Sequence, residues 1–152
     1  MTDLDAYILE HHLTMRTCLE EISTIKRLIK HVEEIAAEHP DRDWFWIIES
    51  LRDIAVDDRD HGWVDEAQRK TSLINWVRLD LTEKAKAGPP KTEDGHKLML
   101  IKSLRSFSTG MEKRWFEADS ALAQALAHQY VERHNINLVP LLEKVETEGG
   151  DA

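Results

Sequence analysis

Residues 2–40 read TDLDAYILEHHLTMRTCLEEISTIKRLIKHVEEIAAEHP, and this stretch decides the fold class. Its apolar residues recur every three or four positions, the period that places them on one face of an α-helix. Thr2 and Asp3 favour a helix start, and His39-Pro40 ends the pattern after Glu38. The apolar face contains Ile8, Met15, Leu19, Ile22, Ile29 and Val32. The stretch therefore predicts a long amphipathic helix from about residue 3 to about residue 38.

Helical spacing continues beyond this stretch, and no strand-like alternation interrupts it. A second helix is predicted from about Asp41 to about Lys86, with or without a break near residues 70–72. Ala87-Gly88-Pro89-Pro90 is a loop by composition, and Thr92 then opens a third helix.

The last part of the chain predicts a fourth helix. Gly110 indicates a break or kink before it, and Pro140 should kink it or end it locally. Four helices joined by short loops predict an all-α fold, an antiparallel up-down four-helix bundle. We expect one domain over residues 1–146 and a disordered tail over residues 147–152.

The composition restricts the function. The net charge of −9 disfavours binding to nucleic acid or to anionic membrane surfaces. Cys18 is the only cysteine, which leaves no internal disulfide and no thiolate metal cage. The sequence shows no leader pattern and no apolar run long enough for a membrane span, so a cytoplasmic protein is expected.

Each predicted helix places ionisable residues on the stripe that should be buried. A buried imidazole or carboxylate without a partner costs several kcal/mol, roughly, so four such helices predict a shared partner. Metal is the economical choice, because imidazole, carboxylate and phenolate groups are ligands of iron, manganese and zinc. Either His11 or His12 faces inward, but not both. The candidate metal ligands are His12, Asp58, His61, Asp65, His96, Tyr130 and His134.

Several of these stretches resemble the haemerythrin-like family of cation-binding bundles. Glu10-His11-His12-Leu13-Thr14-Met15-Arg16 is similar to the family's first-helix motif, and His61-Gly62-Trp63-Val64-Asp65-Glu66 is similar to its second. Gly88-Pro89-Pro90 with Glu93-Asp94-Gly95-His96 resembles its loop and third-helix histidine. His134-Asn135-Ile136-Asn137-Leu138-Val139-Pro140 resembles its fourth-helix ending. The resemblance touches all four helices and most of residues 4–143.

The resemblance implies non-haem iron, two ions per chain, with dioxygen or peroxide as the small ligand. It further implies oxygen binding, redox sensing, iron handling or a peroxide-degrading activity. Two departures alter the implied site: Tyr130 and His134 stand where the family has His and Glu, and Asp65 stands where it has Glu. The alternatives are an altered di-iron site bridged by Asp65 alone or with Asp58, a site with one iron or zinc, or a lost site retained as polar core.

A second functional class is a metal-free interaction module. Trp44, Phe45 and Trp46 are consecutive and cannot all face one core, and three more tryptophans follow at 63, 76 and 115. Exposed aromatic residues mark binding surfaces, so this region predicts a homodimer or a protein partner. A metal-free enzyme is less well supported, because no Ser-His-Asp order, glycine-rich phosphate loop or zinc-protease motif is present.

Overall fold

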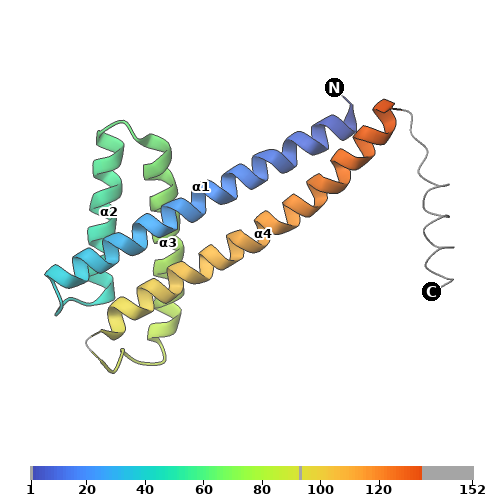
Figure 1. Ribbon diagram of the computed structural model, residues 1–152. Coiled ribbons are helices and arrows are strands. Elements are labelled where there is room, and N and C mark those ends of the chain that lie inside the picture. Colours follow the sequence, from blue (N-terminus) through green and yellow to red (C-terminus); the bar gives the residue numbers. More distant parts are fainter. Residues whose placement is uncertain (1, 93, 135–152) are drawn as a thin grey trace, which may run out of the picture. The chain divides into compact units, whose positions relative to one another are not determined.

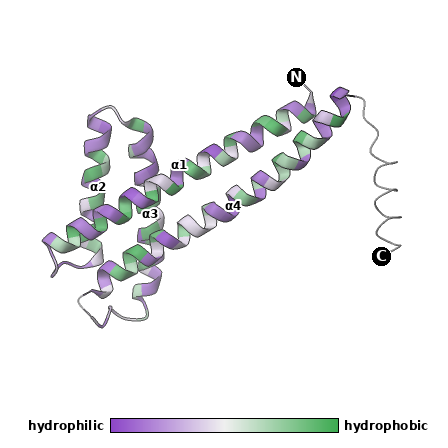
Figure 2. Ribbon diagram, viewed as in Figure 1, coloured by the Kyte–Doolittle hydropathy of each residue, from purple (hydrophilic) through white to green (hydrophobic). Residues whose placement is uncertain are grey.

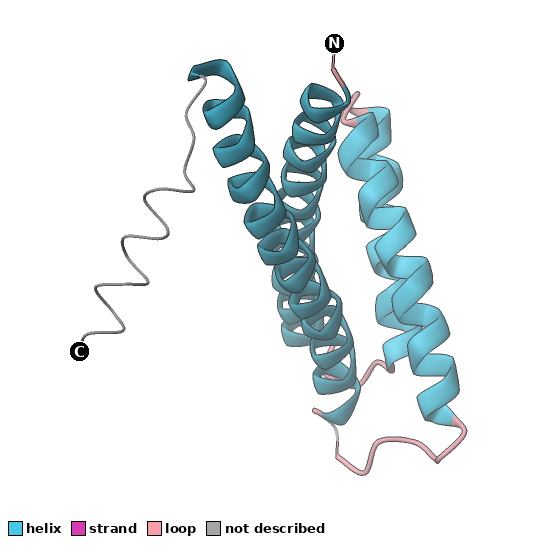
Figure 3. Cartoon of the chain, turned by 90° about the vertical axis from the view of Figure 1, so that its right-hand side faces the viewer, coloured by secondary structure: helices cyan, strands magenta, loops and turns pink. Residues whose placement is uncertain are grey.

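The computed structural model describes residues 2–92 and 94–134, and these form helices joined by turns and loops (Figure 3). The helices are α1 (Asp3–Glu38), α2 (Trp44–Asp60), α3 (Val64–Ala85) and α4 (Gly95–His134). No strand occurs in the described ranges, so the predicted all-α fold of four helices is confirmed. In this part of the chain no helix is both long and apolar enough to cross a membrane. The tail predicted for residues 147–152 lies outside the described residues.

Local hydrogen bonds explain where two of the helices begin. The Asp5 backbone N–H donates to Thr2 Oγ1 at 3.1 Å and the Thr2 N–H donates to Asp5 Oδ2 at 3.3 Å, the reciprocal pattern of a capping box. At the start of α2 the Trp46 N–H donates to Asp43 Oδ1 at 2.8 Å. The cap of this helix is therefore Asp43, two residues beyond the predicted Asp41. Both caps satisfy backbone N–H groups that a helix start leaves without partners.

Two predicted helix boundaries are wrong. The second helix was expected to continue to about Lys86, with any break near residues 70–72, but it ends at Asp60. Gly62 adopts a φ of +87°, which glycine tolerates and other residues rarely do, and this reverses the chain before α3. Gly110, in contrast, lies inside a continuous α4. A glycine inside a helix costs only about 1 kcal/mol relative to alanine, which neighbouring contacts can offset.

The helices contribute to two compact units. The central unit contains residues 16–115, and the terminal unit contains residues 1–15 together with the chain from residue 116 onward. Hydrophobic and hydrophilic residues alternate along each of the described helices (Figure 2). α1 and α4 contribute residues to both units.

The central unit has the larger apolar core, built by segments of all four helices. In this unit α2 and α3 lie side by side across a tight turn (Figure 1). They are antiparallel, since Arg52 pairs with Asn75 while Asp58 pairs with Lys70. A buried aliphatic side chain contributes about 1.5–3 kcal/mol by its removal from water. The buried core residues are Ile25, Leu28, Val32, Ile47, Ile48, Leu51, Ala55, Leu73, Ile74, Val77, Leu81, Leu100, Ile101 and Leu104.

Among its described residues the terminal unit has a much smaller core. Ile8, Leu122 and Ala125 are its buried apolar cluster. A polar contact adds to it, because Gln129 Nε2 donates to Asp5 Oδ1 at 2.8 Å. Few of the described side chains of this unit are buried, so we expect these residues to contribute less to stability than the central core does.

Candidate functional site

The predicted ligand His61 is exposed rather than inward-facing. It is the C-cap residue of α2. Its Nδ1 lies 2.8 Å from the carbonyl oxygen of Asp57, and its ring stacks on the Trp63 ring at 5.7 Å between centroids. The hydrogen bond to the Asp57 backbone, together with the nearby Asp57 carboxylate, raises the pKa of His61. Asp65 is also exposed, at the start of α3. The expectation that this pair faces the core is therefore wrong.

Asp58 is buried as predicted, but its partner is a lysine. Only 6% of Asp58 and 4% of Lys70 are exposed, and Lys70 Nζ lies 2.5 Å from Asp58 Oδ2. Lys70 Nζ also lies 3.9 Å from Glu66 Oε1. The ammonium group neutralises the buried carboxylate, and the pair joins α2 to α3. This ion pair thus neutralises the Asp58 carboxylate, a role that we predicted for a metal ion from the sequence.

His96 is half-buried and closes the start of α2. Its Nδ1 accepts a hydrogen bond from the Trp44 backbone N–H at 3.2 Å. This N–H is one of the first in the helix, and such groups have no partner inside the helix. The Nδ1 atom needs its lone pair for this contact, so a metal at Nδ1 would displace it.

The other three predicted ligands belong to the terminal unit. Tyr130 is 57% exposed, and its ring lies 4.3 Å from the ring of His134, centroid to centroid. His12 and His134 are exposed as well, whereas His11 is half-buried and its Nδ1 lies 2.7 Å from the carbonyl oxygen of Tyr7. The expected burial of Tyr130 and His134 on a core stripe is therefore wrong, and His12 does not face inward.

The predicted ligands are not grouped among the residues that the structure describes. They are divided between two units, and in residues 2–92 and 94–134 no three His, Cys, Asp or Glu side chains are grouped as a metal site requires. Iron binding stays a prediction from the resemblance.

A second polar network surrounds Glu66 in the central unit. Arg27 donates twice to its carboxylate, through Nε and Nη2 at 2.7 Å each, and Arg69 Nη2 donates at 2.8 Å. Thr24 Oγ1, which is fully buried, donates to the same carboxylate at 3.1 Å. Burial opposes ionisation of Glu66, but the hydrogen bonds from Arg27, Arg69 and Thr24 outweigh it and lower its pKa to about 2. This network fixes α1 to α3.

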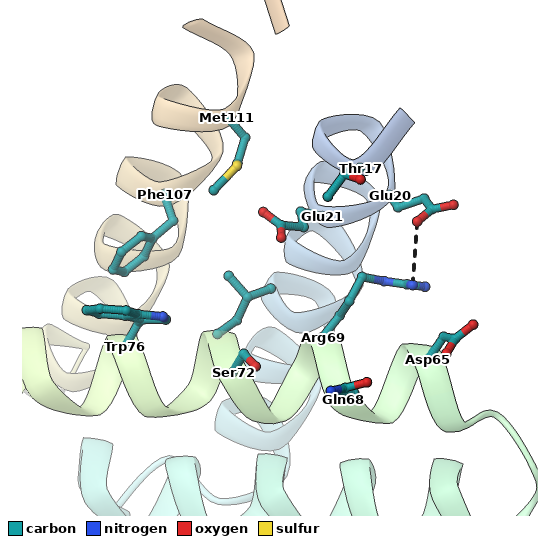
Figure 4. A pocket seen from close by; sticks show the side chains of 11 residues that line it. Thr17, Glu20, Glu21, Asp65, Gln68, Arg69, Ser72, Trp76, Phe107 and Met111 are labelled. Carbon is teal, nitrogen blue, oxygen red and sulfur yellow. Dashed lines mark ion pairs between the residues drawn. The ribbon is translucent and has the colours of Figure 1, made fainter. Parts of the chain in front are cut away.

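A groove of about 630 Å³ lies in the central unit. Its walls come from α1, α3 and α4, and its lining side chains differ in character from one end to the other (Figure 4). Trp76, Phe107 and Met111 form the apolar end of the groove. Its volume lies within the range of about 300–1,000 Å³ that is usual for ligand sites. The complete lining is Thr17, Glu20, Glu21, Asp65, Gln68, Arg69, Ser72, Leu73, Trp76, Phe107 and Met111.

The charges in the groove are unbalanced. Three carboxylates line it, from Glu20, Glu21 and Asp65, against the single guanidinium of Arg69. Arg69 is already engaged, with Glu66 at 2.8 Å and with Glu20 at 3.7 Å. Glu21 and Asp65 have no hydrogen-bond or ion-pair partner among the described side chains. The groove therefore presents uncompensated negative charge beside an apolar end.

The tryptophans divide between core and surface in a way that the sequence did not specify. Trp44 and Trp46 are half-buried and pack against the central core, so the segment expected to form an interface is largely used for folding. Trp76 is 59% exposed at the groove, and Trp63 is 61% exposed at the α2–α3 turn. The two most exposed tryptophans therefore lie on α3 and in the turn that precedes it.

Comparisons with protein-family models, curated proteins and solved structures give no match for this chain. Sequence reasoning missed the groove because its lining comes from three helices whose mutual packing no local pattern specifies. One signal was available: Asp65, Gln68, Ser72 and Trp76 recur at helical spacing and form a polar stripe that ends in a large aromatic residue.

Proposed function

We propose that this protein is an interaction module whose groove binds a basic, amphipathic segment of a partner protein. The observation that carries the proposal is the combination of uncompensated carboxylates with an exposed aromatic end in one groove. Glu21 and Asp65 supply the negative charge, and Trp76 supplies the apolar contact area. Aromatic residues in partly enclosed sites are the commonest sources of binding energy at protein interfaces.

A basic partner fits this surface better than an acidic or a purely apolar one. The chain as a whole carries a net charge of −9, which accelerates the approach of cationic segments and repels anionic ones. A purely apolar segment would cover Glu21 and Asp65 without pairing them, at the cost of their desolvation. A lysine or arginine removes that cost by pairing with the carboxylates.

The test is isothermal titration calorimetry with a tryptophan-free helical peptide that has leucines on one face and lysines on the other. The groove variant is Glu21→Gln/Asp65→Asn, and Trp76→Ala removes the aromatic contact. Partly exposed ion pairs contribute about 0.2–1 kcal/mol each, so the double variant should lose about 2- to 30-fold in affinity. Trp76→Ala should cost about 2 kcal/mol, or about 30-fold.

A matched control separates groove binding from general charge attraction. Glu38→Gln/Asp53→Asn makes the same change in net charge at two exposed positions that do not line the groove. The control should bind as the unmodified protein does. Equal losses in the groove and control variants, or full binding by Trp76→Ala, would show that the peptide does not use the groove.

A further inference from the structure

The geometry of the groove points to the shape of the partner segment: we infer that it is an α-helix lying along α3, with an apolar and a basic side chain three helical turns apart. This inference rests on the proposed function, because it specifies the segment that the same groove binds. It is carried by the separation between the aromatic and acidic ends of the groove and by the chemistry of its walls (Figure 4).

The two ends of the groove are a fixed distance apart along one helix. Asp65 lies at the acidic end and Trp76 at the apolar end, eleven positions along α3, which corresponds to about 16 Å at 1.5 Å per residue. Eleven positions are also about three turns at 3.6 residues per turn. Two partner residues at that spacing therefore share one face of a helix, and both can face the groove at once.

The walls favour a helical partner over an extended one. All three walls are α-helices, whose backbone N–H and C=O groups bond within each helix apart from the first N–H groups of α3 near Asp65. An extended segment would need partners for its own backbone, and the groove provides no sheet edge. The polar side chains between the two ends, Gln68 and Ser72, could pair with only a fraction of an extended backbone. A helix satisfies its backbone internally and needs only side-chain contacts.

The dipole of the partner helix determines whether that helix runs parallel or antiparallel to α3. α3 begins at Val64, so Asp65 lies in its first turn and Trp76 lies farther toward its C-terminal end. A partner helix antiparallel to α3 places its own C-terminal end near Asp65. Basic residues are favoured at helix C-termini, so the basic side chain should follow the apolar one in the partner sequence. The inferred order is apolar first and basic eleven positions later.

The test uses four tryptophan-free peptides, of which the first three have identical composition in an alanine- and glutamine-rich helical host. The first has phenylalanine followed by arginine eleven positions later, and the second has a spacing of seven. The third reverses the order at a spacing of eleven. The fourth contains prolines and presents the two residues five positions apart in an extended chain, which spans a similar distance of about 16 Å. Affinities are measured by calorimetry, and circular dichroism confirms that the first three have equal helicity.

We expect the first peptide to bind about 2- to 5-fold more tightly than each of the others, from one additional, partly exposed charge contact. Asp65→Asn should remove this advantage, and the matched control Asp53→Asn should preserve it. Equal binding of all four peptides that is still weakened by Trp76→Ala would overturn the inference while leaving the proposed function intact. Tighter binding of the proline peptide would overturn the helical partner. No binding by any peptide would overturn both proposals.

Discussion

Replacing Lys70 by methionine tests whether the buried ion pair between α2 and α3 acts as the structure indicates. Lys70 and Asp58 are 4% and 6% exposed, and their charged atoms lie 2.5 Å apart. Methionine retains most of the length of the lysine side chain but removes its charge. The substitution therefore leaves the Asp58 carboxylate buried without a counterion.

The magnitude follows from that loss of compensation. Breaking a buried pair by removing one member costs about 3–5 kcal/mol, whereas replacing both members by apolar residues of similar volume is often neutral. Glu66 is also near Lys70, at 3.9 Å, but Arg27 and Arg69 still pair with it in the variant. We therefore expect Lys70→Met to lower the free energy of unfolding by about 3–5 kcal/mol, and Asp58→Leu/Lys70→Met to recover most of it.

Urea denaturation followed by circular dichroism at 222 nm measures these free energies. The matched control is Lys86→Met, since Lys86 pairs with Glu83 at 2.9 Å while both side chains remain exposed, at 69% and 72%. That control should change the free energy of unfolding by less than about 0.5 kcal/mol. The interpretation is refuted if Lys70→Met is within about 1 kcal/mol of the unmodified protein, or if the double variant is no more stable than Lys70→Met.

Three further predictions address the other polar and apolar groups. Because the folded pKa of Glu66 is lowered to about 2, its contribution is present above its ordinary value of 4.5 and is lost as the pH falls toward 2. After allowance for partial solvent screening, Glu66→Gln should cost about 1–2 kcal/mol at neutral pH in urea denaturation, and a cost that did not decline between pH 4.5 and 2 would contradict this. Leu104 is 1% exposed, so Leu104→Ala should destabilise the protein by about 2–5 kcal/mol, and a change in melting temperature of under a few degrees would be inconsistent with its burial. His61→Ala/His96→Ala should leave the metal content measured by mass spectrometry unchanged. If the unmodified protein instead holds two irons per chain and this variant loses them, the result would support the haemerythrin-like site.

The sequence was informative about helices because their apolar period is local. The start of α1 at Asp3 and its end at Glu38 agree with the predicted capping and proline signals. The turn at Gly62 was missed because Asp58, His61 and Asp65 keep a helical spacing across it. Because the polar residues keep a helical period through residues 58–65, their spacing does not indicate the turn. The positive φ of Gly62 in the structure does.

The candidate site was less predictable because compensation of charge depends on tertiary contacts. The sequence correctly placed Asp58 inside, but the partner that neutralises it lies on the next helix, twelve positions later. Similarly, Tyr130 shares a stripe with leucines, yet a stripe is buried only where another element covers it. Periodicity predicts which residues share a face, whereas the packing of the helices decides which faces are covered.

The composition of the terminal unit has a consequence for the protein during its synthesis. Residues 1–15 find their packing partners in the chain from residue 116 onward, so about 100 residues must be translated before those partners exist. At about 5–20 residues per second, that interval lasts about 5–20 s. During this time Leu4 and Ile8 lack the cluster that later covers them, and they are accessible to chaperones on the nascent chain. The central unit is one continuous stretch of chain, residues 16–115, so it can form before the terminal unit is complete.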